Sequence, residues 1–300
     1  MTTTLVTTPL SFDVRRTRIA GWLTLPGGAG PHPAVVLAHG LGATHGMMLA
    51  QYEQHFAASG IATLAFDYRH TGESGGTPRQ LITMRRHVQD VLGARAYLAA
   101  RPEIDPHRVG LWGTSLGAMH VLRAAAADAD VAAAVIQCPI LHGPDAALSS
   151  GLAHGLRLAP AILSDAVRAA ARLPRRYLPI VGQPGTRAVV TVPGAEEGWN
   201  STVSPGAVFT NQIAAAGALG LAAASALRHA SRITAPLLVC VSDRETLTDP
   251  RIASRAAARA PRGTARHYPG GHFEIYHAPL APTLLADQTA FLQEHLHVAA

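Results

Sequence analysis

The sequence predicts an α/β protein with a doubly wound, mostly parallel sheet. Short apolar runs that end at glycine or polar residues recur along the 300-residue chain, as expected of strands buried on both faces. Helical patterns lie between several of these runs, and such alternation is typical of parallel sheets. Apolar residues make up 48% of the chain and charged residues 15%, which excludes a disordered protein.

The strand predictions begin with two segments of alternating polarity, Leu10–Val14 and Arg18–Leu25, so we expect an antiparallel start. The continuous apolar runs follow at Ala34–Ala38, Ile61–Phe66, Val109–Trp112, Ala132–Gln137 and Pro236–Val241. The clearest helix places Val88, Val91, Leu92, Ala96 and Ala99 on one face, and the last one does so with Leu285, Thr289, Leu292 and Leu296.

The alternation of predicted strands and helices is interrupted between Leu141 and Arg232, where alanine-rich helical stretches alternate with prolines. We interpret residues 141–232 as an insertion over the sheet, within a single domain that spans residues 1–300. Its apolar composition predicts a helical lid with an acyl pocket beneath it.

The strongest local motif is G-x-S-x-G, formed by Gly113, Ser115 and Gly117, with a predicted strand before it and a helical pattern after it. A nucleophile on such a tight turn needs small neighbours on both sides. The motif therefore predicts Ser115 as a nucleophile, which requires a base and an orienting acid.

Several of the 16 histidines compete for the role of base, because His39, His70 and His120 also lie near predicted strand ends or near the motif. We favour His272, on a glycine-flanked loop, because nucleophile, acid and histidine is the chain order of triads in this type of fold. For the acid, spacing alone does not separate Asp243 from Glu245.

Two backbone amides are predicted to stabilise the developing oxyanion. The amide of Leu116 follows the nucleophile directly, and that of Leu41 lies in the glycine turn after the strand that ends at Ala38. The remaining candidates receive structural interpretations: Asp249, before a proline, is a turn or cap residue, and Cys138 and Cys240 are buried core thiols.

These motifs, together with His39-Gly40, the segment from Asp67 to Gly75 and Gly271-His272-Phe273, resemble the α/β-hydrolase superfamily. The resemblance is greatest to the bacterial group of dienelactone hydrolases, acetyl xylan esterases and polyketide-associated hydrolases. It implies that the Asp67–Gly75 segment is a structural turn. The acid segment of these families commonly reads D-R-D-x-x-x-P-P, with the second acidic residue in the triad. This position is Glu245 here, so the resemblance favours Glu245 over Asp243.

The residues together predict a serine esterase that hydrolyses a small-molecule carboxylic ester through an acyl-enzyme. An acyltransferase or a thioesterase acting on a polyketide-type acyl group is the alternative with the same triad. A silent relative that only binds ligands is disfavoured by the complete set of triad candidates. Haloalkane dehalogenases and epoxide hydrolases are disfavoured because they use a carboxylate nucleophile.

Charge and composition limit the partners. The net charge of +6 comes from scattered arginines without a basic run, and only 5% of residues are aromatic, so we expect no nucleic-acid binding. The longest weakly charged apolar stretch, Ile213–Leu227, is too short to span a bilayer, and the N-terminus lacks signal-peptide features. We expect a soluble, cytoplasmic enzyme without membrane contact, cofactor or metal site, and the sequence leaves open whether it forms a homo-oligomer.

Overall fold

The computed structural model describes residues 5–298 and contains an eight-stranded sheet with the order β1-β2-β4-β3-β5-β6-β9-β10. β2 is antiparallel to both of its neighbours, β1 and β4, whereas β4, β3, β5, β6, β9 and β10 are mutually parallel. The strands are β1 (Thr7–Val14), β2 (Thr17–Thr24), β3 (His32–Ala38), β4 (Ala62–Phe66), β5 (Ile104–Thr114), β6 (Ala134–Gln137), β9 (Leu237–Ser242) and β10 (Gly263–Tyr268).

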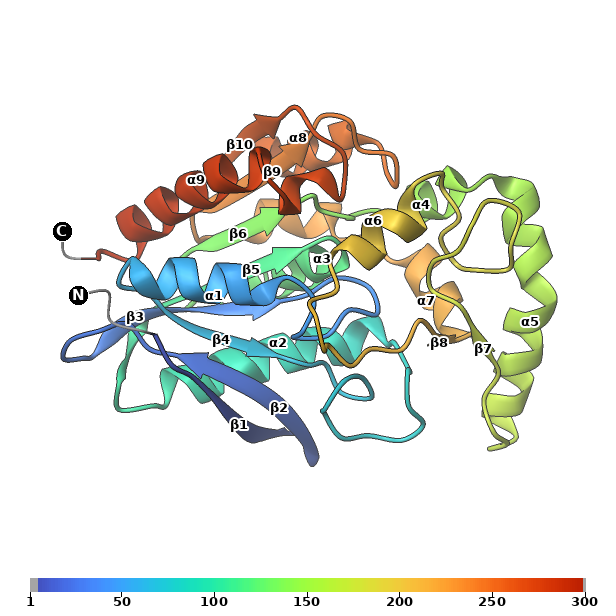
Figure 1. Ribbon diagram of the computed structural model, residues 1–300, viewed down its shortest axis with the longest axis horizontal. Coiled ribbons are helices and arrows are strands. Elements are labelled where there is room, and N and C mark those ends of the chain that lie inside the picture. Colours follow the sequence, from blue (N-terminus) through green and yellow to red (C-terminus); the bar gives the residue numbers. More distant parts are fainter. Residues whose placement is uncertain (1–4, 299–300) are drawn as a thin grey trace.

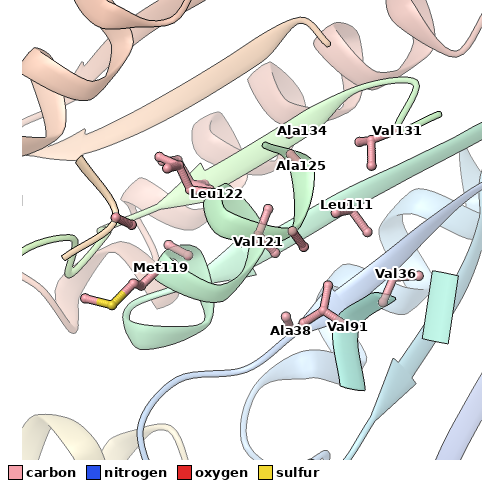
Figure 2. Close-up of a cluster of buried hydrophobic side chains, with 14 of the residues drawn as sticks. Val36, Ala38, Val91, Leu111, Met119, Val121, Leu122, Ala125, Val131 and Ala134 are labelled. Carbon is pink, nitrogen blue, oxygen red and sulfur yellow. The ribbon is translucent and has the colours of Figure 1, made fainter. Parts of the chain in front are cut away.

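Helices cover both faces of this sheet, which makes it doubly wound (Figure 1). One face packs against α2 (Met84–Ala99), α3 (Leu116–Ala125) and α8 (Pro250–Arg259). Figure 2 shows part of this cluster, in which side chains from β3 and β5 gather with those of α2 and α3. The opposite face packs against α1 (Leu49–Ala58) and α9 (Leu280–His295). A short 3-10 helix, η2 (Glu274–Tyr276), precedes α9.

Residues of one strand point alternately into the two clusters because side chains alternate across a strand. In β3, Val36 belongs to the cluster with α2 and α3, whereas Val35 and Leu37 belong to the cluster with α1 and α9. Leu111 and Trp112 of β5 divide in the same way. Burial on both faces explains why these strands appear in the sequence as continuous apolar runs.

The predicted α/β fold with a mostly parallel sheet is confirmed. Most predicted strands agree with the observed bounds within about three residues, but β5 is longer than the predicted 109–112 run because it begins at Ile104, before Pro106. The Asp67–Gly75 segment is a turn, as the resemblance implies: the two Asp67 carboxylate oxygens accept hydrogen bonds from the amides of His45 and Glu73, each at 2.8 Å.

Residues 141–232 lie beyond the carboxyl ends of the parallel strands (Figure 1), except for Leu227–Arg232, which pack against α3 and α8 on one face of the sheet. The elements of this inserted segment are α4 (Gly143–Ser149), α5 (Leu152–Ala170), β7 (Tyr177–Leu178), α6 (Ala195–Ser201), β8 (Ile213–Ala214), α7 (Gly217–Ala223) and η1 (Leu227–Arg232). The antiparallel β7–β8 pair was not predicted, since two-residue strands have no readable period. A third apolar cluster lies within this segment and joins it to the loop after β3.

Candidate active site

Ser115 occupies a tight turn between β5 and α3. Its backbone has φ 55° and ψ −122°, a conformation that residues other than glycine rarely adopt and that costs about 1–3 kcal/mol. The turn is held by neighbouring β6, because the Ser115 amide donates to the Gln137 carbonyl at 3.0 Å and the Ser115 carbonyl accepts from the Ile140 amide at 3.1 Å. A Cβ on Gly117 would overlap the carbonyl oxygens of Ala38 and His39, so the start of α3 requires glycine.

His272 lies on the loop after β10 and connects Ser115 to Glu245. Its Nε2 atom is 2.9 Å from the Ser115 Oγ, and its Nδ1 atom is 2.6 Å from the Glu245 Oε2. The imidazole and the carboxylate are each 3% exposed. The three side chains selected from the sequence therefore form one continuous hydrogen-bonded series, in which His272 and Glu245 have buried side chains and Ser115 is half-buried.

Glu245 is oriented by its own loop after β9. Its Oε1 accepts hydrogen bonds from the amides of Thr246 at 2.9 Å and Leu247 at 2.8 Å, which leaves Oε2 for the imidazole. Asp243 instead pairs with His267 near the surface, with 2.6 Å between Oδ1 and Nδ1. Between the two acids that spacing could not separate, the structure places Glu245 beside His272.

Leu41 and Leu116 both line the cavity into which Ser115 opens. Within residues 5–298, neither of their backbone amides donates a hydrogen bond to another group. The loop of Leu41 passes close to the nucleophile, since a Cβ placed on Gly40 would lie 3.0 Å from the Ser115 Cβ. Two free N–H groups are thus available beside the hydroxyl.

The cavity has a volume of about 350 Å³, which lies in the range of small-molecule sites. More than half of its lining residues come from the inserted segment, and they are mainly apolar, such as Leu158, Ile162 and Ile180. Among residues 5–298, no Asp, Glu or Arg side chain lines it. The described residues also contain no group of three or more His, Cys, Asp and Glu side chains able to hold a metal ion.

The comparison with known proteins decides the family. A family model described as "Serine aminopeptidase, S33" (Hydrolase_4) matches residues 29–279, most of the chain. The chain belongs to the Hydrolase_4 family of α/β hydrolases. The superfamily resemblance inferred from the motifs is therefore confirmed.

Proteins similar to this hydrolase are named for several different activities. The quorum-quenching protein AidA of Acinetobacter baumannii is 34% identical over 284 residues, which cover 95% of this chain and 93% of AidA. The thiohydrolase aneE of Aspergillus aculeatus is 36% identical over 110 residues, 37% of this chain and 35% of that protein. The α/β hydrolase GrgF from Penicillium sp. sh18 has the same fold, with a TM-score of 0.83 over 98% of this chain and 100% of GrgF at 21% identity.

The other histidines considered from the sequence, His39, His70 and His120, do not hydrogen-bond to the nucleophile in this hydrolase. Burial lowers the pKa of His39, whose Nδ1 lies 3.1 Å from the Gly40 carbonyl oxygen. Burial also lowers the pKa of His120 to about 3, which keeps its imidazole neutral. In the described part of the chain, His272 alone hydrogen-bonds to the Ser115 hydroxyl.

Three residues near His272 were not predicted to belong to the site. Thr114, Cys138 and Tyr276 contact one another, with the Cys138 Sγ 3.4 Å from both hydroxyl oxygens and 4.0 Å from His272 Nε2. Cys138 is a buried thiol, as predicted. Cys138 follows β6, which lies beside β5, the strand that ends before Ser115. This position is the sequence feature that could have predicted that Cys138 lies near the site.

The environment of His272 sets the charge of its ring. Burial alone would lower the pKa of the imidazole, but Cys138 and the Glu245 carboxylate outweigh burial and raise that pKa well above its usual value. The Glu245 carboxylate therefore stabilises the positive ring that forms when His272 accepts a proton. Cys240 and Asp249 have structural roles: Cys240 is a buried thiol, and the Asp249 side chain caps α8 by accepting from the Arg251 amide at 2.9 Å.

No helix within residues 5–298 is long and apolar enough to cross a membrane.

Proposed function

We propose that this α/β hydrolase cleaves a carboxylic ester with an apolar acyl group through an acyl-enzyme on Ser115. The hydrogen-bonded series of Ser115, His272 and Glu245, which opens into an apolar cavity, carries the proposal. A serine hydroxyl is a weak nucleophile at neutral pH, and an adjacent base is the arrangement that activates it.

In the first half-reaction, the Ser115 Oγ attacks the ester carbonyl and its proton passes to His272 Nε2. The carbonyl oxygen becomes an oxyanion, which the amides of Leu41 and Leu116 stabilise. The tetrahedral intermediate collapses as His272 gives the proton to the departing alcohol. Water then attacks the acyl group, its proton passes to His272, and collapse returns that proton to Ser115 and releases the acid.

Glu245 is the proposed third member of the triad. The carboxylate holds the imidazole with Nε2 toward Ser115 and favours the positive ring that forms during each attack. Because its other oxygen is fixed by the amides of Thr246 and Leu247, the carboxylate has one orientation available.

We further propose that the inserted segment 141–232 is a lid over the acyl pocket. Its side chains provide most of the apolar lining of the cavity. The family name refers to an aminopeptidase, but a peptide with a free amino terminus needs a nearby carboxylate, and no acidic side chain lines the cavity among the described residues. An uncharged acyl group fits this lining better.

Two measurements test the proposal: labelling by a fluorophosphonate, and hydrolysis of nitrophenyl esters from acetyl to decanoyl. We expect labelling of the wild type and none of Ser115→Ala, with kcat/KM rising from acetyl toward longer acyl groups. Absence of labelling in the folded wild type contradicts the nucleophile, whereas a preference for acetyl contradicts the acyl pocket.

Thioester cleavage or acyl transfer is the second candidate, favoured by the similarity to the thiohydrolase aneE. Both reactions use the same acyl-enzyme, and only the leaving group or the acceptor differs. An oxygen ester and a thioester of the same acyl group, each assayed with and without an added alcohol, separate the three activities. A kcat/KM higher for the thioester by more than tenfold, or alcohol capture exceeding hydrolysis, favours this second candidate.

A further inference from the structure

The outer face of α5 exposes an unusual amount of apolar surface. Leu152, Leu156, Leu163 and Val167 are 61–70% exposed, although they belong to one 19-residue helix. Figure 1 shows α5 at the edge of the molecule, at the end opposite the chain termini. A contiguous apolar patch on a soluble protein commonly marks an interaction surface.

The order of residues along this face has the spacing of a coiled-coil seam. Successive members are separated by four, three, four, three and four positions, the repeat by which two helices pack side by side. The seam residues are Leu152, Leu156, Ala159, Leu163, Ala166 and Ala170; Ala159 and Ala166 are half-buried, and Pro160 lies inside the helix beside the seam.

The seam is complementary to a second copy of itself in the antiparallel orientation. With a two-fold axis at residue 161, Leu152 faces the partner's Ala170 and Leu156 faces the partner's Ala166. Ala159 then faces the partner's Leu163. Each layer joins one large and one small side chain, which lets two helices approach closely without a gap or an overlap.

A fourth pair follows the same rule beside the seam. Gly155, which is exposed and also borders the cavity, would lie opposite the partner's Val167 in this register. The nearby cations do not enter the seam: Arg157 donates to the Gly185 carbonyl at 2.8 Å, and Arg168 donates to the Pro174 carbonyl at 2.6 Å. Both guanidinium groups are thus engaged by their own chain.

We propose that a second copy of this chain covers the outer face of α5 in an antiparallel, two-fold helix pair. A lipid surface would require only apolar area with cationic flanks, whereas large and small residues arranged in a two-fold register match a helix of the same sequence. The inner face of α5 lines the cavity through His154, Leu158 and Ile162. Pairing would therefore brace one wall of the cavity.

Sedimentation velocity over a range of protein concentrations tests the pairing through layer-exchange variants. Leu156→Ala leaves a gap and Ala166→Leu brings two leucines together, so each should weaken dimerisation at least about tenfold. The double variant restores one large and one small residue in each layer and should recover most of the lost affinity. Val208→Ala, at a residue that is 81% exposed outside α5, is the matched control and should leave dimerisation unchanged.

A wild type that stays monomeric at all concentrations overturns the proposal. So does stronger association of Ala166→Leu, which would indicate unspecific apolar contact, or binding of the monomer to anionic phospholipid vesicles with no dimer. Thermal melting confirms that each variant is folded.

Disulfide formation tests the antiparallel register separately. Leu156→Cys with Ala166→Cys should form crosslinked dimers upon oxidation, since the two native cysteines are buried. Leu156→Cys alone should not, because ten residues of helix separate the two sulfur positions by about 15 Å in this register. Efficient crosslinking of the single variant would show a parallel pair and contradict the two-fold arrangement.

Discussion

The sheet and the inserted segment are each stabilised by different kinds of interaction. The central strands are buried on both faces between two apolar clusters, whereas the inserted segment has one smaller cluster and many exposed leucines. Buried Asp165 joins distant parts of the segment by accepting from the Arg175 guanidinium at 2.6 and 2.8 Å and from the amides of Arg176 and Ala216 at 2.8 Å.

Because of this difference, we expect the reaction type and the preference for acyl length to depend on different parts of the molecule. The candidate nucleophile, base and acid all follow strands of the rigid sheet, while most of the cavity lining belongs to the inserted segment. We therefore expect the reaction type to depend on the sheet and the size of the acyl group to depend on the segment. Four variants test this division.

The largest effect is expected for Glu245→Gln, which keeps the shape of the side chain but removes its charge. Activity should fall by roughly 10⁴-fold, as in triads that lose the acid. Because Glu245 contributes to raising the pKa of His272, its loss lowers that pKa. The neutral base then persists to lower pH, so the acidic limb of kcat/KM should move to lower pH.

Asp243→Asn is the matched control for this variant, since Asp243 follows the same strand but pairs with His267. Its kcat/KM should stay within about twofold of the wild type, as expected for a surface pair. Loss of activity in Asp243→Asn with wild-type activity in Glu245→Gln would reverse the assignment of the acid.

Leu111→Ala tests the sheet. Leu111 is fully buried in β5, four residues before the nucleophile, and its truncation leaves a cavity in the core. We expect the free energy of unfolding to fall by about 2–5 kcal/mol. Urea unfolding followed by circular dichroism and by tryptophan fluorescence, in a Trp199→Phe background that leaves Trp22 and Trp112 of the sheet to report, should give one coincident transition, and separate transitions would contradict a single cooperative sheet.

Asp165→Asn tests the inserted segment. The amide nitrogen cannot accept the hydrogen bonds that the carboxylate accepts, so we expect a loss of about 1–3 kcal/mol that is confined to this segment. Hydrogen exchange followed by mass spectrometry should become faster in residues 141–232 and stay unchanged in β5. Equal acceleration in both regions would show that the segment and the sheet unfold together.

Leu158→Trp tests whether the inserted segment determines the acyl preference without affecting the reaction itself. The larger side chain fills space that a long acyl group would occupy, so kcat/KM for decanoyl esters should fall by about tenfold, or 1.4 kcal/mol. The acetyl ester is the internal control and should react as before. A parallel fall for both esters would mean that this wall affects the reacting groups and not only the acyl group.

The same contrast explains how much the sequence predicts. Continuous apolar runs locate the strands within a few residues because burial on both faces allows few polar residues. The turn around Ser115 is also predictable because glycine spacing is a local property, and the loop of His272 is predictable because the order of triad residues along the chain is typical of this fold. The path of residues 141–232 was not predicted, because its organisation depends on contacts such as those of Asp165 between residues distant in sequence.

Sequence spacing also could not decide between Glu245 and Asp243 as the acid, because that choice depends on the folded loop. Both acids follow β9, and only the loop conformation decides which carboxylate reaches His272. The contacts of Cys138 with Thr114 and Tyr276 likewise depend on the order of strands in the sheet, since β6 lies beside β5.

The most direct test of the account is mass spectrometry of the protein quenched during turnover of a nitrophenyl decanoate ester. We predict a single adduct with the mass of the acyl group, located by proteolysis on the peptide that contains Ser115, and no adduct on Ser115→Ala. Wild-type turnover rates in Ser115→Ala, or an acyl group attached stoichiometrically to another residue, would contradict the assignment of Ser115 as the nucleophile.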